Sequence, residues 1–425
     1  MTTLFEELTW RGLIYDSTEG LSELLAKEER VTAYVGFDPT ASSLHVGHLL
    51  GVLALRRLQL SGHTPIAVVG GGTGMIGDPS GKSQERVLLS QEKIEENIVG
   101  IRKQLERRFL DFEGSNAAQI VNNADWLGTI DLLTFLRDVG KHFTVNYMLQ
   151  KESVSRRLES EDGISFTEFS YLMLQSYDFL QLSDRFNCSV QLGGSDQWGN
   201  ITAGIELIRK LRARKAHGLV WPLMKSSSGV KFGKTEAGAV WLDPARTSPY
   251  KFYQFWLNTN DADVENYLKC FTYKNDDEIK ELLSALPPDA DARYRQRVLA
   301  EDVTRLVHGP DLTLRAQKAS ELLFTEHITG IPVDDVLSVF EDVPSTDVPT
   351  EEFGAEGLGV VDLIARVQLA PSKSEARRLL QSGGVYVNNR RVSDLQARLK
   401  RDEAIGGRLF VLRKGQKQYH LVRLT

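Results

Sequence analysis

Val31-Thr-Ala-Tyr-Val-Gly-Phe37 is predicted to be a buried strand, and Asp38-Pro-Thr-Ala-Ser-Ser43 follows it as a turn rich in helix-capping residues. Leu44 to Leu60 then carries apolar residues at helical spacing. The pattern returns downstream, with strands expected over 65–69, 119–121, 189–192 and 219–224, and helices over 91–112, over 165–182 and from Asp196. Strands that alternate with helices predict an α/β fold: a Rossmann-like parallel sheet with helices on both faces.

The strand signals stop after about residue 247, and five helices are predicted over 249–257, 262–271, 277–286, 292–307 and 312–323. Residues 341–356 contain two prolines and five acids before Gly354, which is typical of a linker. We therefore expect a Rossmann-like domain over 1–247, an all-helical domain over 248–335, a linker over 336–356 and a small α+β domain over 357–425.

Charge is distributed unevenly along the chain, whose net charge is −6. Residues 357–425 carry 14 basic and 5 acidic side chains, a net +9, and the remainder carries 37 and 52, a net −15. A basic module on an acidic body suggests contact with a polyanion, with an idle basic surface as the alternative.

Several classes of protein are disfavoured by the sequence. No run approaches the roughly 18 apolar residues that span a membrane, and the acidic start does not resemble a targeting peptide. Cys188 and Cys270 are the only cysteines, and they form no CxxC or Cys/His cluster. We expect a cytoplasmic protein with no membrane contact and no structural zinc.

The stretch His45-Val-Gly-His48 follows the first strand at the mouth of a helix, and Lys231-Phe-Gly-Lys-Thr235 lies far downstream in a Gly/Ser-rich loop. A helix N-terminus favours an anion, and Gly47 allows a ligand to approach the backbone. Together the two segments are able to surround a triphosphate, which suits activation of a carboxylate by ATP. Capping histidines, or a metal pair without a third ligand, are the alternatives.

Gly72 to Gly77 matches the GxGxxG pattern after a strand, which raises a dinucleotide-binding alternative. Such a pattern should open a helix, but Pro79 follows at once. A Walker loop also fits poorly, because three residues rather than four separate Gly77 from Gly81. We interpret the segment as a glycine loop whose Lys82 and Arg86 close over phosphates.

Tyr171, Gln175 and Asp178 share one face of an apolar helix. That face is either the polar outside of the helix or a partly buried surface on which Asp178 needs a donor, such as a ligand hydroxyl. The stretch Gln191 to Asn200 follows a strand, and its glycine pair, 193–194, marks the edge where open α/β sheets bind ligands. In this stretch the carboxylate at position 196 either caps a helix or holds a ribose.

These motifs, in this order, resemble those of class I aminoacyl-tRNA synthetases, and specifically the bacterial tyrosyl-tRNA synthetases. His45 to His48 resembles the HIGH signature with Val46 in place of Ile, and Lys231 to Thr235 resembles KMSKS in its KFGKT form, with Gly233 in place of the first Ser. Residues 34–40, 171–178 and 193–200 also match that family. Residues 371–379 and 383–388 resemble the RNA-binding domain named after small-subunit ribosomal protein four. Gly51, one turn after the signature, offers no side chain near the presumed ribose.

The resemblance implies that the carboxylate of L-tyrosine attacks the α-phosphate of ATP, and that the tyrosyl group then passes to the 3′ end of tRNA(Tyr). It implies Mg²⁺ on the phosphates, no tightly bound protein metal, no editing domain and a homodimer. The catalytic candidates are Thr40, His45, His48, Lys82, Arg86, Lys231, Lys234 and Thr235. The tyrosine-binding candidates are Tyr34, Asp78, Tyr171, Gln175, Asp178 and Gln191. The ATP-binding candidates are Gly36, Asp38, His45, Gly47, His48, Gly193, Asp196, Gln197 and Lys234. The RNA-binding candidates are Lys373, Arg377 and Arg378.

Within the tyrosine-binding group, Tyr34 and Asp178 are the expected partners of the phenol hydroxyl, and Asp78, Tyr171 and Gln175 those of the ammonium group. Three alternatives stay open at this point. The chain is a tryptophanyl-type synthetase, an RNA-binding protein whose nucleotide site has decayed, or an NAD enzyme that uses the glycine pattern.

Overall fold

The computed structural model of the chain describes residues 3–28, 30–80, 88–159, 163–227, 232–235, 238–284, 292–322, 332–340, 343–415 and 418–425. Its contacts define two compact units. The first consists of Met1–Thr247 and Asn258–Val307, and the second of Ser248–Leu257 and His308–Thr425. None of the described helices is both long enough and apolar enough to cross a membrane.

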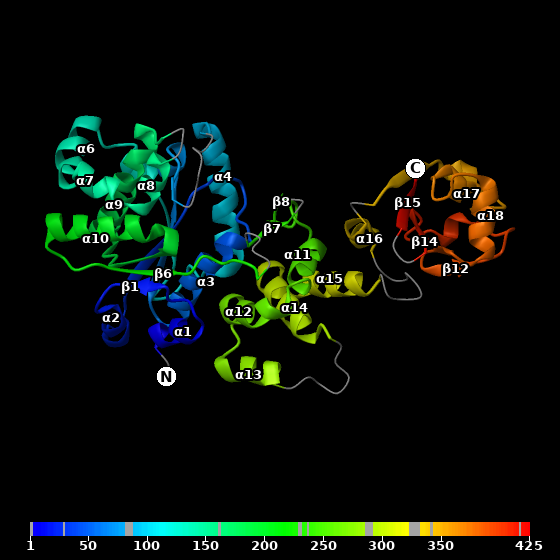
Figure 1. Cartoon of the computed structure of the whole chain (residues 1–425), viewed down its shortest axis with the longest axis horizontal. Helices are drawn as coiled ribbons and strands as arrows, with labels where there is room; N and C mark the ends of the chain where they lie inside the picture. Colours follow the sequence, from blue (N-terminus) through cyan, green and yellow to red (C-terminus); the bar gives the residue numbers. More distant parts are fainter. Residues whose placement is uncertain are drawn as a thin grey trace. The chain divides into compact units, whose positions relative to one another are not determined.

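A six-stranded sheet forms the centre of the first unit, in the order β1-β6-β5-β2-β3-β4 (Figure 1). All neighbouring strands are parallel except β1 and β6, which confirms the predicted α/β fold. The order reverses beside β2, because β3 and β4 lie on one side of it and β5 and β6 on the other. Open α/β sheets bind their ligands at such a reversal. The strands are β1 (Asp16–Ser17), β2 (Thr32–Phe37), β3 (Thr64–Val69), β4 (Gln119–Asn122), β5 (Val190–Gly194) and β6 (His217–Trp221).

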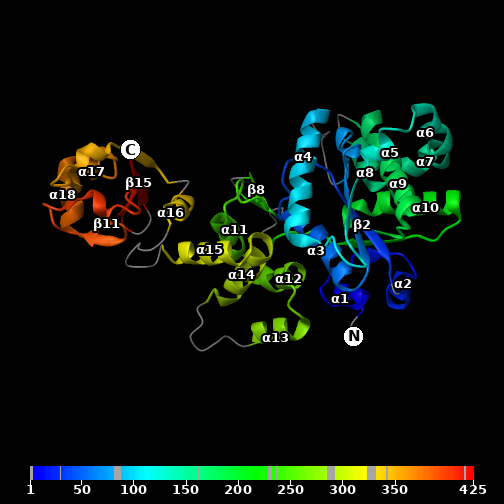
Figure 2. The ribbon, with the colours of Figure 1, turned by 180° about the vertical axis from the view of Figure 1, so that it is seen from behind.

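Helices cover both faces of this sheet (Figure 2). On one face lie α3 (Val46–Leu60) and α4 (Gln91–Gln104), and on the other α9 (Phe166–Phe186) and α10 (Trp198–Arg212). All six residues of β3 are buried, as expected for a strand with helices on both sides. The helix predicted over 91–112 is shorter than expected, because α4 passes into a π turn at 105–109.

Shorter elements complete the first unit. Near its start are α1 (Leu4–Trp10) and α2 (Leu21–Lys27). Between β4 and α9 come α5 (Ala124–Leu127), α6 (Leu132–Asp138), α7 (Val145–Leu149) and α8 (Glu152–Leu158). After β6 come β7 (Lys234–Thr235), β8 (Gly238–Ala239), α12 (Asp261–Phe271), α13 (Asp276–Ser284) and α14 (Tyr294–His308).

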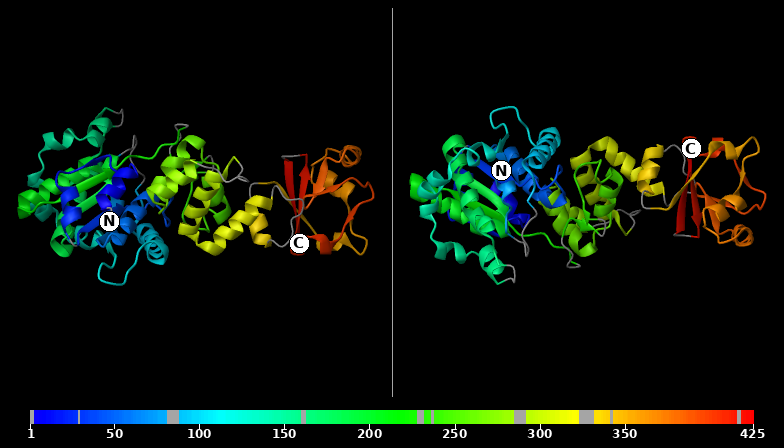
Figure 3. Two further views of the ribbon diagram at one scale, coloured as in Figure 1. Left: turned by 90° about the horizontal axis from the view of Figure 1, so that it is seen from below. Right: turned by 90° about the horizontal axis from the view of Figure 1, so that it is seen from above.

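The second unit combines helices with a five-stranded sheet in the order β12-β11-β14-β15-β9. In β14, Leu409 and Val411 pack against α16, while Phe410 and Leu412 pack into the cluster with α17 and α18. Side chains alternate between the faces of a strand, so a run buried on both faces needs cover on each. Figure 3 shows the orange ribbon of α18 beside the red strands of this sheet. The helices are α11 (Pro249–Leu257), α15 (Pro310–Leu322), α16 (Val333–Val339), α17 (Val360–Arg366) and α18 (Lys373–Gln381). The strands are β9 (Ser345–Val348), β11 (Val385–Val387), β12 (Arg390–Val392), β14 (Leu409–Lys414) and β15 (Gln418–Leu424), with β10 (Leu358–Gly359) and β13 (Arg398–Leu399) as a separate pair.

The segment 336–356, interpreted above as a linker, contributes the end of α16 and all of β9 to this unit, and β9 pairs in parallel with β15. The four domain boundaries proposed from the sequence stay predictions.

Candidate active site

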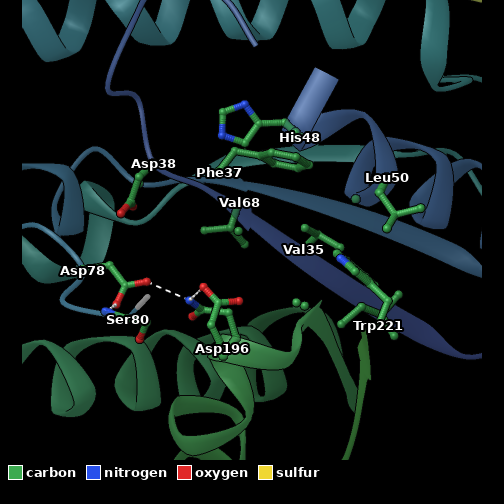
Figure 4. Close-up of a pocket in the computed structure, with 18 of the residues that line it drawn as sticks. Val35, Phe37, Asp38, His48, Leu50, Val68, Asp78, Ser80, Asp196 and Trp221 are labelled. Carbon is green, nitrogen blue, oxygen red and sulfur yellow. Dashed lines mark hydrogen bonds between the residues drawn. The ribbon is translucent and has the colours of Figure 1, made fainter. Parts of the chain in front are cut away.

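A cavity of about 630 Å³ opens at the carboxyl ends of β2, β3 and β5, beside the reversal of strand order. Its volume is suited to a small-molecule ligand. Figure 4 shows Asp38, His48, Asp78 and Asp196 arranged around it. The candidates that line it come from segments far apart in the sequence: Tyr34, Gly36, Asp38, Thr40, His45, Gly47, His48, Asp78, Tyr171, Gln175, Asp178, Gln191, Gly193, Asp196 and Gln197. The structure thus brings these residues together, while their individual roles stay predictions.

The remaining candidates are placed differently. Lys82, Arg86 and Lys231 lie outside the described residues. Lys234 and Thr235 form β7. The three RNA-binding candidates, Lys373, Arg377 and Arg378, lie on α18 of the second unit.

Asp178 lines the cavity and is 4% exposed. Its carboxylate accepts hydrogen bonds from Asn123 Nδ2 at 2.9 Å and from Trp126 Nε1 at 2.6 Å. Burial raises the pKa of Asp178 to about 7, against the opposing effect of these two donors. The alternative that Asp178 lies on the polar outside of its helix is therefore wrong.

Two buried polar atoms that line the cavity have no hydrogen-bond partner among the described residues. They are the hydroxyl of Tyr34 and Oε1 of Gln191. The Tyr34 ring itself is fixed edge-on against Phe179, with the ring centroids 5.3 Å apart. Burial raises the pKa of the Tyr34 hydroxyl well above its usual value, and the charge of Asp178 raises it further. A buried hydroxyl without a partner is costly, so the geometry favours a ligand that supplies one.

A second polar network lies around Asp78. Asp78 Oδ2 accepts from Gln197 Nε2 at 2.7 Å, and Asp78 Oδ1 accepts from the backbone N–H of Ser80 at 2.8 Å. Gln197 Oε1 in turn accepts from Gln175 Nε2 at 3.2 Å and from Asn200 Nδ2 at the same distance. These contacts hold the Asp78 carboxylate in place at the cavity wall, where a ligand cation would be stabilised.

The position of Asp196 bears on whether it caps a helix or binds a ribose. Gln197, not Asp196, is the N-cap residue of α10. It lies in a single 3-10 turn after β5 and lines the cavity.

The two histidines of the His45–His48 motif form one unit. The N–H of Gly47 donates to His45 Nδ1 at 3.0 Å, and the N–H of His45 donates to His48 Nδ1 at 3.3 Å. Their rings stack with centroids 3.9 Å apart. Because both Nδ1 atoms accept, each neutral ring carries its proton on Nε2, which is then a donor suited to phosphate oxygens. A Cβ at Gly47 would lie 2.7 Å from Cε1 of His45, so any larger residue there would displace the His45 ring from this position.

The distant KFGKT segment is joined to this motif through the backbone of Val240. The N–H of Val46 donates to the carbonyl oxygen of Val240 at 2.9 Å, and the N–H of Val240 donates to that of Gly233 at 3.1 Å. His45 and Trp241 form an antiparallel bridge. Gly233 has φ +79°, and a Cβ there would lie 2.7 Å from Cγ2 of Val46. Gly233 therefore allows the close approach of the two motifs.

The sequence reasoning missed three residues of the site. Asn123 donates to both Asp178 and Thr73, Trp126 donates to Asp178, and Thr73 donates to Asp38. Tyr171 donates to the same Asp38 at 3.1 Å, so one continuous network joins these side chains. Asn123 directly follows β4, and its position at the carboxyl end of a parallel strand was a signal that would have identified it.

The glycine pattern of residues 72–77 does not open a helix. It forms a 3-10 turn over 73–75, and the N–H of Gly72 donates to Asn123. The helix on which a dinucleotide-binding fingerprint depends does not begin there, which disfavours the NAD alternative.

Residues 26–325 match the family model described as tRNA synthetases class I (W and Y), and residues 335–422 match that of the tyrosine–tRNA ligase SYY-like C-terminal domain. The chain belongs to this family of class I tRNA synthetases, which confirms the resemblance inferred from the motifs.

Similar proteins support the same placement. The tyrosine–tRNA ligase of Roseiflexus castenholzii is 54% identical over 426 residues, covering 100% of each chain. That of Geobacillus stearothermophilus is 51% identical and covers 99% of each. The crystal structure of a C-terminally truncated Coccidioides posadasii mitochondrial tyrosyl-tRNA synthetase is 31% identical, with a TM-score of 0.65, and the match covers 75% of this chain and 92% of that one.

The raised pKa of Asp178 makes stability depend on pH. Because its folded-state pKa of about 7 lies above the usual value, the native state holds the proton more tightly than the unfolded state. Stability from this group is therefore full below about pH 4 and is lost as the pH rises to about 7. Relative to Asp178→Asn, we expect the free energy of unfolding of the unaltered chain to fall by on the order of 2 kcal/mol between pH 5 and pH 8. Urea unfolding of both proteins measures this difference, and parallel pH profiles would contradict it.

Gly233→Ala tests the junction of the two motifs. Alanine is strained at φ +79° and its Cβ would strike Val46, so the KFGKT segment must shift away from the His45–His48 motif. We expect the rate of nucleotide-dependent chemistry to fall about 10-fold, since strain of about 1–2 kcal/mol is relieved by displacing the segment. Binding at the Asp178 end of the cavity should not change. Gly238→Ala, also at positive φ but with open space around its Cβ, is the matched control.

Proposed function

We propose that this chain activates L-tyrosine with ATP and transfers the tyrosyl group to the 3′ end of tRNA(Tyr). The observation that carries the proposal is the unpartnered, buried hydroxyl of Tyr34 at the same cavity as the carboxyl of Asp178. A phenol hydroxyl has one donor and acceptor lone pairs, so it is able to pair with both groups. The indole of tryptophan has a donor only. Similarity to tyrosine–tRNA ligases over the full chain supports tyrosine over the tryptophanyl-type alternative.

In the proposed first step, a carboxylate oxygen of tyrosine bonds to the α-phosphorus of ATP while the bond to the bridging oxygen breaks and pyrophosphate leaves. No protein nucleophile is needed, so the chain acts by positioning and by stabilising charge. Thr40, His45 and His48 would donate to phosphate and ribose oxygens, with the Lys and Arg candidates of the two loops joining them. Asp78 and Gln175 would hold the ammonium group at the network described above.

In the second step, a terminal ribose hydroxyl of the tRNA attacks the mixed anhydride and AMP leaves. Magnesium would accompany ATP, because Mg²⁺ is commonly bound by one or two carboxylates together with substrate phosphates. Among the described residues, no group of three or more such side chains is placed to hold a metal ion, so the phosphates of ATP would hold it. It would neutralise phosphate charge when bound.

Residues on α18 would contact the RNA. Lys373, Arg377 and Arg378 are exposed on this helix. Lys373 lies 2.7 Å from Asp362 and Arg378 lies 3.7 Å from Glu375, and exposed pairs of this kind are weak enough to yield to a phosphate.

A homodimer in the cytoplasm is the proposed assembly. Large apolar side chains are exposed from α6 to the start of α9: Leu132, Leu133, Leu136, Val145, Leu149, Leu158 and Phe166. Exposed apolar residues concentrated in one region are typical of a protein interface. Sedimentation of the purified chain tests the assembly directly.

Exchange of labelled pyrophosphate into ATP tests the activity. We expect exchange that depends on tyrosine and not on phenylalanine or tryptophan. Exchange driven by tryptophan would support the other branch of the family, and no exchange with any amino acid would support an RNA-binding protein with a decayed nucleotide site.

Tyr34→Phe should have opposite effects on stability and selectivity. Removing a hydroxyl that has no partner leaves the free energy of unfolding unchanged or raises it. Loss of one neutral hydrogen bond of about 1 kcal/mol should lower kcat/KM for tyrosine about 5-fold and leave that for phenylalanine unchanged. Steady-state exchange with each amino acid measures the ratio. An unaltered preference for tyrosine would contradict the proposed pairing.

A further inference from the structure

Two buried arginines close the C-terminal end of α12, outside the cavity. Arg11, which follows α1, is 2% exposed. Its Nη1 donates to the carbonyl oxygen of Lys269 at 2.7 Å, and its Nη2 donates to that of Lys274 at 2.9 Å. The last carbonyls of a helix have no partner within the helix and carry the negative end of its dipole. A guanidinium group at this position donates hydrogen bonds to these carbonyl oxygens and places a positive charge at the negative end of the dipole.

Arg57, near the end of α3, completes the arrangement and is 1% exposed. Its Nη2 donates to the carbonyl oxygens of Cys270 and Thr272, both at 2.9 Å. Glu7 lies 2.9 Å from Nε of Arg11 and 3.7 Å from Nε of Arg57, so a single carboxylate faces both guanidinium groups. The helix end supplies part of the compensation for two buried positive charges, while Nε and Nη1 of Arg57 have no hydrogen-bond partner among the described residues.

The end of α12 also supports the KFGKT segment. Phe271, the last residue of α12, stacks on Phe232 with ring centroids 5.1 Å apart and an interplanar angle of 14°. Tyr267, one turn earlier, meets Phe232 edge-on at 5.1 Å. Both Phe232 and Phe271 line the cavity.

The helix α3 is therefore connected to this segment in two ways, one direct and one through α12. Its N-terminal end touches Gly233 through Val46, as described above. Its C-terminal part holds α12 through Arg57, and α12 holds Phe232 through Phe271. The described part of this segment, 232–235, is thus held relative to the His45–His48 motif at two points, both set by one helix.

We propose that Arg11 and Arg57 are positioning residues for adenylate formation, acting through α12 and Phe271 on the KFGKT segment. The inference rests on the proposed function. Neither arginine touches the cavity, so they affect the placement of the segment and not the binding of tyrosine, which occurs at the Asp178 end.

A mutant cycle in the full-length protein tests this proposal. Arg57→Lys keeps a buried positive charge but loses the two-carbonyl geometry, and Phe271→Leu keeps apolar volume but loses the stacking on Phe232. The single-turnover rate of adenylate formation and the dissociation constant of tyrosine are measured for both variants and for the double variant. Arg157→Lys is the matched control, because Arg157 is also buried but is paired with Glu168 between α8 and α9.

We expect each single variant to lower the single-turnover rate by about 5- to 20-fold with tyrosine affinity unchanged, and the double variant to be little slower than the slower single one. Three outcomes would each overturn the proposal. The rate reductions of the two single variants multiply in the double variant, the rate of Arg57→Lys is unchanged, or the control Arg157→Lys loses as much rate as Arg57→Lys. If the unaltered chain shows no tyrosine-dependent exchange, the proposed function fails instead, so the two failures are distinguishable.

Discussion

Asp178→Ala is expected to reduce kcat/KM for tyrosine by about 10²-fold, because hydrogen bonds to charged groups contribute about 1.5–3 kcal/mol each. The carboxyl of Asp178 is the buried group that faces the phenol hydroxyl in the proposed complex. Its removal also leaves Asn123 and Trp126 without their acceptor. The KM for ATP should change less than that for tyrosine, because Asp38 is joined to Asp178 only through Asn123 and Thr73. Pyrophosphate exchange at varied tyrosine and varied ATP separates the two effects.

Ser176→Ala is the matched control for that variant. Ser176 lies on the same helix, α9, and is fully buried, but its hydroxyl donates to the carbonyl oxygen of Leu172 and not into the cavity. It should keep tyrosine affinity within about 2-fold, since only a local hydrogen bond is lost. Equal tyrosine affinity in Asp178→Ala and in the control would contradict the assignment of the pocket.

Removal of residues 332–425 is expected to abolish tRNA charging while sparing adenylate formation. The cut must precede α16, because Val336 and Phe340 pack on the five-stranded sheet and β9 is part of that sheet. The cavity lies wholly in the first unit, so exchange should stay within about 2-fold of normal. Charging should fall by at least about 10²-fold, because contacts with several phosphates are lost together. Aminoacylation with labelled tyrosine measures it.

Substitution of Lys373, Arg377 and Arg378 by alanine in the full-length chain separates loss of RNA contacts from loss of the module. Each phosphate contact that is lost should lower the slope of log affinity against log salt by about 0.7–0.9. An unchanged salt dependence would show that α18 does not contact the RNA. Normal charging by the truncated chain would contradict a role for the whole module.

The parts of the fold that the sequence predicted are those with strong periodicity. The parallel strands β2 to β6 and the long helices α3 and α9 lie within a few residues of their predicted bounds, and α10 begins within two residues of its predicted start. The short helices α5 to α8 were not predicted, because elements of four to seven residues carry too few turns to show a period. The two-residue strand β1 is defined only by its antiparallel pairing with β6, which no local pattern encodes.

The candidate site was likewise predicted only where a local sequence pattern marked its residues. Its candidates were found where a motif marked them, and the cavity brings together those at the carboxyl ends of the strands. Thr73 and Trp126 were missed because they act through other side chains, a relation that depends on tertiary contacts. Asn123 directly follows β4 and could have been identified. The β-bridge between His45 and Trp241 could not be predicted from the sequence, since it joins segments almost 200 residues apart.

The imidazole of His45 folded over Gly47 has a consequence for any redesign of this protein. The glycine exists to make room for the ring beside it, and the backbone of that same tetrapeptide is in turn paired with the chain around Val240. The conformation of His45–His48 therefore depends on its pairing with the segment around Val240. The sequence His45–His48, grafted onto another scaffold without the segment around Val240, would therefore not keep the conformation described above.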